Sequence, residues 1–328
     1  MKRLLRFLKD WTLPVAISIG VALYFLFTRC LALHAAADVL TPWVERLFPF
    51  NVFLILWATF TKVDFRTLRL PRWALRLTAV QIASAAVLLG GAMMLRDGGS
   101  LVVSGALACV IAPCATASPV VTGKLGGNIQ DMTAYVLISS LLSALFIPFC
   151  AAMLAPSGVG SLATMVQVGV RVLWRVGAVL VLPLILGCAV RYWLSPLYRW
   201  VVRHSDLPFY LWCLALATTS GITVRAIDQS ALPIATLLAL AAGALLVCLA
   251  QFSIGRRIGH CFNSRVEGGQ ALGQKNTALI IWATSTFFNP ATSLAPGCYV
   301  LWQNIVNSWQ IHRARHVKQA KTQRRAGE

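Results

Sequence analysis

Charged residues are scarce in this chain of 328 residues, and acidic residues are the scarcest of them. Only 12% of the residues are charged, whereas an average soluble domain has about 25%. Ten residues are Asp or Glu, so the sequence offers few carboxylate pairs for acid–base chemistry. In contrast, 58% are hydrophobic, and apolar runs near the hydrocarbon thickness recur along the chain. These features predict a polytopic, all-α integral membrane protein.

The motifs of common enzymes and metal sites are absent as well. The nine cysteines form no CxxC pair, and the five histidines lie in expected loops or at segment ends. No HExxH motif occurs, and no Ser-His-Asp arrangement can be assembled from deep positions. We therefore expect no cofactor, no resident metal and no enzymatic activity.

The net charge of +19 raises the question of nucleic acid binding, but the positions of the charges argue against it. The basic residues lie between apolar runs and at both ends of the chain, which is typical of membrane topology signals. The expected partners are the lipid bilayer and a small-molecule substrate; the sequence leaves the oligomeric state open.

Ten apolar segments can be counted as transmembrane helices. They are Trp11–Phe27, Leu47–Phe60, Leu77–Leu95, Leu101–Leu125, Met132–Leu154, Val168–Val190, Leu207–Ile222, Leu232–Ile254, Gly268–Phe288 and Ala291–Ile311. With a cytoplasmic N-terminus, 22 basic residues fall on the cytoplasmic side and six on the other. This bias predicts a multi-pass protein of the cell membrane (the inner or plasma membrane) with both termini in the cytoplasm.

The ten segments divide into two sets of five, residues 1–157 and 158–328. A shift of 157 residues carries the start of the first segment onto that of the sixth, and the end of the fifth onto that of the tenth. Because five spans is an odd number, the second set must be inverted relative to the first. The sequence thus predicts two inverted five-helix repeats, a common plan for transporters.

The fourth and ninth segments are each interrupted. Pro113 and Pro119 remove backbone donors from the fourth, and Gly268, Gly269 and Gly273 loosen the ninth. The 157-residue shift carries Ser118 onto Lys275, so the two interruptions correspond. Paired helix breaks predict a binding site near the membrane midplane. The expected site residues are Lys275, Asn276, Thr116, Ser118, Gln81, Gln274 and Asn304.

Several short motifs carry a resemblance to a known family. Residues 116–118 read Thr-Ala-Ser, residues 273–276 read Gly-Gln-Lys-Asn, and residues 302–304 read Trp-Gln-Asn. Together with Gln81 they resemble the bile acid:sodium symporter family. The resemblance implies ten helices, with helices four and nine broken and crossing at the centre. It also implies a core of helices 3–5 and 8–10 and a panel of helices 1, 2, 6 and 7.

The sequence departs from this family at its sodium sites. The family motif in helix nine is Glu-x-Gly-x-Gln-Asn, whose glutamate helps to bind two sodium ions. Ala271 stands at the glutamate position, Lys275 at the glutamine, and Pro119 at the asparagine that follows Thr-Ala-Ser. The resemblance therefore implies that the sodium sites are lost. We hypothesise that the ammonium of Lys275 replaces the bound cation and binds carbonyls and hydroxyls freed by the breaks, such as those of Thr116 and Ser118. A second interpretation is that Lys275 gives up a proton and couples transport to pH, so the sequence leaves the coupling ion open.

Three functions are compared on these grounds. The favoured one is a secondary transporter of a small organic anion, working by alternating access and independent of sodium; an ordinary sodium-coupled symporter is the alternative. An integral membrane enzyme lacks the necessary residues. A receptor that uses Lys275 as a Schiff-base lysine lacks a mid-membrane carboxylate counter-ion.

Overall fold

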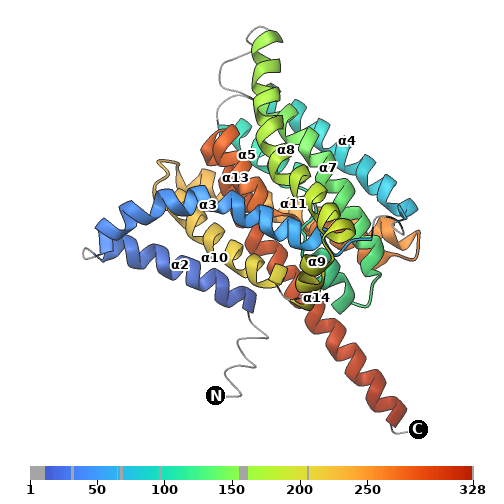
Figure 1. The fold of residues 1–328 in the computed structure, drawn as a ribbon. Helices are drawn as coiled ribbons and strands as arrows, with labels where there is room; N and C mark the ends of the chain where they lie inside the picture. The colour runs from blue at the N-terminus through green and yellow to red at the C-terminus, as the bar shows by residue number, and fades with distance from the viewer. Residues whose placement is uncertain are drawn as a thin grey trace.

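The computed structural model describes residues 12–30, 33–64, 66, 69–95, 98–154, 162–204 and 207–326. Within these ranges 86% of the residues are helical and no strand is present. The helices of the amino-terminal half are α2 (Thr12–Arg29), α3 (His34–Phe60), α4 (Arg72–Met94), α5 (Gly98–Ile111), α6 (Ser118–Lys124) and α7 (Ile129–Met153). Their arrangement is shown in Figure 1.

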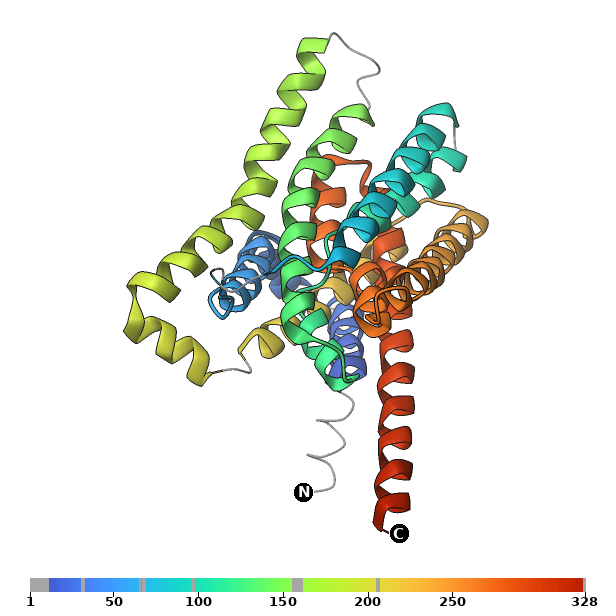
Figure 2. The ribbon, with the colours of Figure 1, turned by 90° about the vertical axis from the view of Figure 1, so that its right-hand side faces the viewer.

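The carboxy-terminal half has a similar order of long and short helices, with one additional short helix, α9. It contains α8 (Leu162–Trp193), α9 (Ser195–Arg203), α10 (Leu207–Asp228), α11 (Ile234–His260), α12 (Arg265–Gly273), α13 (Thr277–Phe287) and α14 (Leu294–Ala326), with a short 3-10 turn at Pro290–Ser293. The end of α14 projects beyond the other helices, as both ribbon views show (Figures 1 and 2).

Six helices of the described chain are long and apolar enough to cross a membrane. These are Val39–Phe60, Arg72–Met94, Ile129–Met153, Gly169–Trp193, Tyr210–Asp228 and Ile234–His260. Val15–Arg29, Ser100–Ile111 and Thr277–Phe287 are apolar but shorter. The all-helical membrane class expected from the sequence is therefore confirmed, while the count of ten spans stays a prediction.

Each of the ten expected segments overlaps a described helix or a pair of short helices, although several boundaries were wrong. The second segment was expected to begin at Leu47, but α3 begins at His34 and runs through Pro42 and Pro49. Apolar membrane helices tolerate such prolines because neighbouring groups can satisfy the freed backbone. The tenth segment was expected to end at Ile311, but α14 continues into the basic tail. Trp11, expected to open the first segment, lies outside the described residues.

The helices form two groups, which also contact each other, most extensively where α7 packs on α8. In the first group α2 packs on α10, and α3 packs on both α8 and α10. In the second, α4 packs on α5, α11 packs on α12 and α14, and α7 packs on α6. We call these the panel group (α2, α3, α8, α10) and the core group (α4–α7, α11–α14). The short helices α5, α6, α12 and α13 thus all lie in the core group.

Close helix contacts depend on glycine where backbones approach each other. A Cβ on Gly268 of α12 would lie 2.2 Å from the carbonyl oxygen of Gly255 of α11. No side chain fits in that space, so only glycine allows α11 and α12 to meet at this distance. The contact holds α12 in place immediately before the second helix break.

Candidate substrate site at two helix breaks

Both interrupted segments break, each between two short helices. The second break follows Gly273, whereas Gly268 and Gly269, which were also expected to loosen the segment, lie inside α12. The first break, residues 112–117, separates α5 from α6, whose first turn contains Pro119. The second break, residues 274–276, separates α12 from α13. Asn276 caps α13, because its side-chain oxygen accepts a hydrogen bond of 3.2 Å from the backbone amide of Leu279. Each break therefore ends in a residue that starts a new helix.

The two breaks lie side by side and run in opposite directions. Cys114 and Lys275 form an isolated antiparallel β-bridge. The amide of Ala115 donates to the carbonyl of Gln274, and the amide of Asn276 donates to the carbonyl of Pro113, each over 2.8 Å. Backbone groups released by one break are thus satisfied by the other. The bridge pairs Lys275 with Cys114 and not with Ser118; the correspondence of Ser118 with Lys275 between the two halves stays a prediction.

Helices α7 and α14 fix the two bridge residues from opposite sides. The hydroxyl of Ser139 on α7 accepts a hydrogen bond from the amide of Cys114. The side-chain oxygen of Gln303 on α14 accepts one of 2.8 Å from the amide of Lys275. Both acceptors are buried, so these bonds leave neither bridge amide unsatisfied in the protein interior.

The side chain of Lys275 is buried at the end of α5. It is 1% exposed, and its Nζ donates to the carbonyl oxygens of Val110 and Ala112, both at 3.1 Å. These carbonyls belong to the carboxy-terminal end of α5, where the helix dipole places partial negative charge. Lys275 was expected to bind carbonyls and hydroxyls freed by the breaks, such as those of Thr116 and Ser118. Its partners are two backbone carbonyls and not these hydroxyls, because the ended helix offers unpaired acceptors.

Gln81 of α4 supports the same carbonyls. Its Nε2 donates hydrogen bonds to the carbonyl oxygens of Val110, over 2.9 Å, and Ala112, over 3.4 Å. Its Oε1 accepts a hydrogen bond of 3.3 Å from the hydroxyl of Tyr135 on α7. The end of α5 is therefore held by an amide and an ammonium together. Gln81 is 4% exposed and lies behind the break.

A similar glutamine–tyrosine pair holds the end of α12. The hydroxyl of Tyr299 on α14 donates to the carbonyl of Gly273 over 2.8 Å. Gln251 of α11 donates to that hydroxyl over 3.4 Å. No ammonium takes part among the described residues here, so the two helix ends differ in charge.

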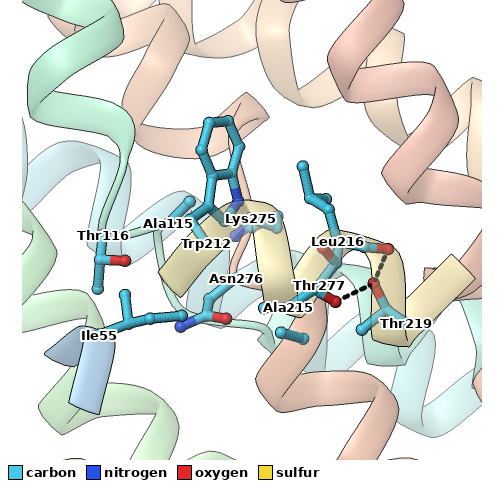
Figure 3. Close-up of a pocket in the computed structure, with 11 residues that line it drawn as sticks. Ile55, Ala115, Thr116, Trp212, Ala215, Leu216, Thr219, Lys275, Asn276 and Thr277 are labelled. Atoms are coloured by element: carbon cyan, nitrogen blue, oxygen red, sulfur yellow. Dashed lines mark hydrogen bonds between the residues drawn. The ribbon is translucent and has the colours of Figure 1, made fainter. Parts of the chain in front are cut away.

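A small cavity of about 10 Å³ lies where the breaks meet the panel group (Figure 3). Core residues on one side include Thr116, Lys275 and Asn276, and the residues on the other side come from α3 and α10. The full lining is Ile55, Ala115, Thr116, Trp212, Ala215, Leu216, Thr219, Lys275, Asn276, Thr277 and Ala278. This volume holds about one water molecule. An organic anion could enter only if the panel and core groups moved apart.

The expected site residues divide into two sets. Thr116, Lys275 and Asn276 line the cavity; Ser118, Gln81, Gln274 and Asn304 do not. Ser118 lies behind the first break and accepts a weak hydrogen bond from the thiol of Cys114 at 3.2 Å. Asn304 donates to the carbonyl of Val300 on its own helix over 2.7 Å. Of these four side chains, those of Gln81 and Ser118 form hydrogen bonds with residues of the first break.

The panel side of the cavity was not identified from the sequence. Trp212, Leu216 and Thr219 of α10 line it, but an apolar helix carries no motif that marks its inner face. Gln303 could have been found, because it lies inside the Trp-Gln-Asn motif of residues 302–304. Tyr135 precedes Ser139 by four residues, as Tyr299 precedes Gln303. This repeated spacing also indicates Ser139 and Gln303.

The positions implied to bind sodium in the resembled family offer no suitable side chain. Ala271 is fully buried and Pro119 is buried, and neither carries a side-chain oxygen. Position 275 carries an ammonium, which already occupies the carbonyls at the end of α5. The residues present therefore do not fit a sodium ion at these positions.

Comparison with known proteins identifies the family. The chain matches the model of the Sodium Bile acid symporter family over residues 49–230, more than half of its length. The match includes the first break and ends before the second, in which Lys275 lies. No curated protein matches the sequence. With apolar helices long enough to cross a bilayer several times, the chain belongs to the sodium bile acid symporter family and is a multi-pass membrane transporter, not an enzyme.

Proposed function

We propose that this protein transports a small organic anion by alternating access, without sodium, and that Lys275 takes the place of a bound cation. One observation carries the proposal: the buried ammonium of Lys275 binds the carbonyls of Val110 and Ala112 at the bridged helix breaks. Carbonyl oxygens of this kind are typical ligands of a metal cation. A tethered ammonium donates hydrogen bonds to them permanently, so no mobile ion is needed there to bind them.

A second cation at this site would be repelled. Two unit charges about 4 Å apart repel by roughly 4 kcal/mol at an effective dielectric constant near 20. The carboxylate that offsets such charge in the family is replaced by Ala271, which is fully buried. Sodium binding beside Lys275 would therefore be weak.

The cavity has features that suit an anion. Lys275 and Asn276, whose side chain carries an amide, line it. Helix α13 begins there with Thr277 and Ala278. A helix amino terminus carries partial positive charge. Ile55, Trp212 and Leu216 form an apolar wall opposite. We propose that Thr116, Lys275 and Asn276 contact the substrate, while Gln81, Ser118, Gln274 and Asn304 keep the breaks in shape.

The architecture we propose has ten spans in two inverted repeats, residues 1–157 and 158–328. Support comes from paired contacts: α2 packs on α10 as α8 packs on α3, and α4 packs on α12 as α11 packs on α5. Swapping the two halves also exchanges the two hydrogen bonds of the bridge between Cys114 and Lys275. The offset between the halves is then near 161 residues at the breaks, not 157.

Alternating access follows from the position of the cavity between the panel and core groups. Because the cavity has room for about one water molecule, the two groups must separate to admit a substrate and close again around it. We propose that the core group moves relative to the panel group, exposing the breaks to one side of the membrane at a time.

Transport in proteoliposomes tests the proposal. The purified protein is reconstituted, and uptake of labelled taurocholate, cholate and benzoate is measured in sodium and in choline buffers. We expect uptake of at least one anion to be equal in both buffers. Lys275→Met should abolish it, whereas Lys124→Met, which changes an exposed lysine at the end of α6, should leave it intact.

The second candidate is an ordinary sodium-coupled symporter, which family membership favours. In that case uptake would require sodium and would follow the sodium gradient, and choline would abolish it. Such a result would overturn the role proposed for Lys275. Failure of all three anions to move in either buffer would contradict transport of organic anions as a class.

We also propose that both termini face the cytoplasm of a cell membrane, because of the excess of basic residues on one side of the expected spans. A reporter that is active only in the cytoplasm, fused after Glu328, should give signal. A reporter active only outside the cytoplasm should stay silent at the same position. The opposite pattern would require an odd number of spans and would remove the inverted repeat.

A further inference from the structure

The ammonium of Lys275 has no acidic partner in the described part of the chain. An ion pair joins Arg191, near the end of α8, to Asp64 in the loop after α3, away from the breaks in sequence. Glu267 lies on α12, which ends before the second break, and its carboxylate accepts a hydrogen bond from the amide of Asn128. Lys275 is therefore a buried positive charge held by backbone carbonyls alone.

Lys275 lines the cavity, and the cavity wall opposite is apolar. Trp212, Ala215 and Leu216 of α10 and Ile55 of α3 close over the breaks. When the panel and core groups close, water is excluded from the neighbourhood of the ammonium. A buried charge without a counter-ion is costly, and a carboxylate or sulfonate in the cavity would remove most of that cost.

We propose that this transporter is an exchanger, which moves one organic monoanion inward for each one it moves outward. The inference rests on the proposed function, and it concerns how the carrier returns. With a monoanion bound, the site is neutral, and the carrier can convert between the states that are open to either side of the membrane. Without one, the carrier must pass through the closed state while the positive charge of Lys275 has no counter-ion. This cost slows the return of the unloaded carrier.

The charge balance of the cycle is complete without a further ion. One monoanion crosses in each direction, the ammonium of Lys275 keeps its proton throughout, and no net charge moves. A dianion would leave the site negative, so the single ammonium favours monoanions with an apolar body that fits against Trp212 and Leu216. Exchange should therefore not respond to membrane voltage, whereas net uptake should.

The test compares proteoliposomes preloaded with an unlabelled anion with proteoliposomes that contain buffer alone. Labelled taurocholate is added outside in sodium-free medium, and initial rates are measured. We expect preloading with taurocholate to raise the rate by about tenfold or more, a barrier difference of about 1.4 kcal/mol per tenfold step. Preloading with succinate, a dianion, should give little stimulation. A valinomycin-imposed potential should alter the slow net uptake and leave the exchange rate unchanged.

Two substitutions connect the effect to charge. Lys275→Arg retains the positive charge and should retain the stimulation by preloading. Lys275→Gln restores an uncharged amide and should remove the stimulation, either by making net uptake as fast as exchange or by abolishing transport. Thermal unfolding in detergent identifies any variant that fails to fold. Stimulation that persists in a folded, active Lys275→Gln protein would overturn the proposal.

The outcomes separate this inference from the proposed function. Sodium-independent transport with equal rates in preloaded and unloaded vesicles contradicts exchange and leaves the proposed function standing. Absence of transport in both vesicle types contradicts the proposed function, and exchange falls with it. Net uptake driven by a sodium gradient contradicts both.

Discussion

Cys114 and Lys275 face each other across an antiparallel bridge, although 160 residues of chain separate them. The bridge joins the two helix breaks through a pair of 2.8 Å hydrogen bonds between backbone groups. Each break on its own would leave buried amides and carbonyls unsatisfied in a membrane, where every such group costs several kcal/mol. The breaks are therefore stable only together, and the site exists because they meet.

The first prediction concerns Gln303, whose side-chain oxygen accepts a hydrogen bond from the backbone amide of Lys275. Gln303→Leu would leave that buried amide without an acceptor and should destabilise the protein by about 1–3 kcal/mol. Gln303→Glu keeps an acceptor oxygen and should restore much of the stability. Thermal unfolding in detergent measures both. Equal stability of Gln303→Leu and the unmodified protein would contradict the role of this bond.

The second prediction concerns the contact of α11 with α12. Gly268→Ala places a methyl group 2.2 Å from the carbonyl oxygen of Gly255, so the helices must separate and stability should fall. Gly90→Ala is the matched control, because its Cβ meets nothing within 4 Å. There alanine should be neutral, or stabilising by up to about 1 kcal/mol, since glycine is a poor helix former. If both variants unfold at the same temperature, the close approach is not as described.

The third prediction separates residues that line the cavity from residues behind it. Thr116→Ala and Asn276→Ser should each raise KM for the transported anion, because both side chains line the cavity. Serine at position 276 keeps an N-cap oxygen for α13, so its effect reports on substrate contact. Ser118→Ala and Asn304→Ala should change KM much less. A larger KM change in the second pair would place the substrate behind the breaks.

The fourth prediction concerns pH and the loop after α3. The guanidinium of Arg191, which donates to Asp64 over 2.8 Å, lowers the pKa of that carboxyl below its usual value. The pair therefore stabilises the fold above the unfolded pKa of aspartate, and this contribution is lost as the pH falls through the lowered value. The melting temperature of the unmodified protein should exceed that of Asp64→Asn near neutral pH. The difference should vanish in acid; a difference that grows in acid would contradict the sign.

The sequence by itself determined the class of the protein and the location of its two breaks. Scarce charge and apolar runs of about 20 residues predict helices that cross a bilayer. In hydrocarbon no water can bind the backbone, and a helix satisfies its backbone groups within itself. Pro113, Pro119 and Gly273 act on their own segments, so their effect is visible without knowledge of the fold. The motifs around Thr116 and Asn276 likewise indicated the family that the comparison shows.

Only the tertiary structure decided what each break meets. The carbonyls that bind Lys275 lie at the end of α5 and at the start of the first break, and the apolar wall of the cavity belongs to α3 and α10, all distant from Lys275 in sequence. Which carbonyls lie within 3.1 Å of an ammonium depends on the angle and register of two separate helices. No local propensity sets either quantity. The pairing of Lys275 with Cys114 rather than Ser118 has the same origin, because packing of α7 and α14 fixes the register of the bridge.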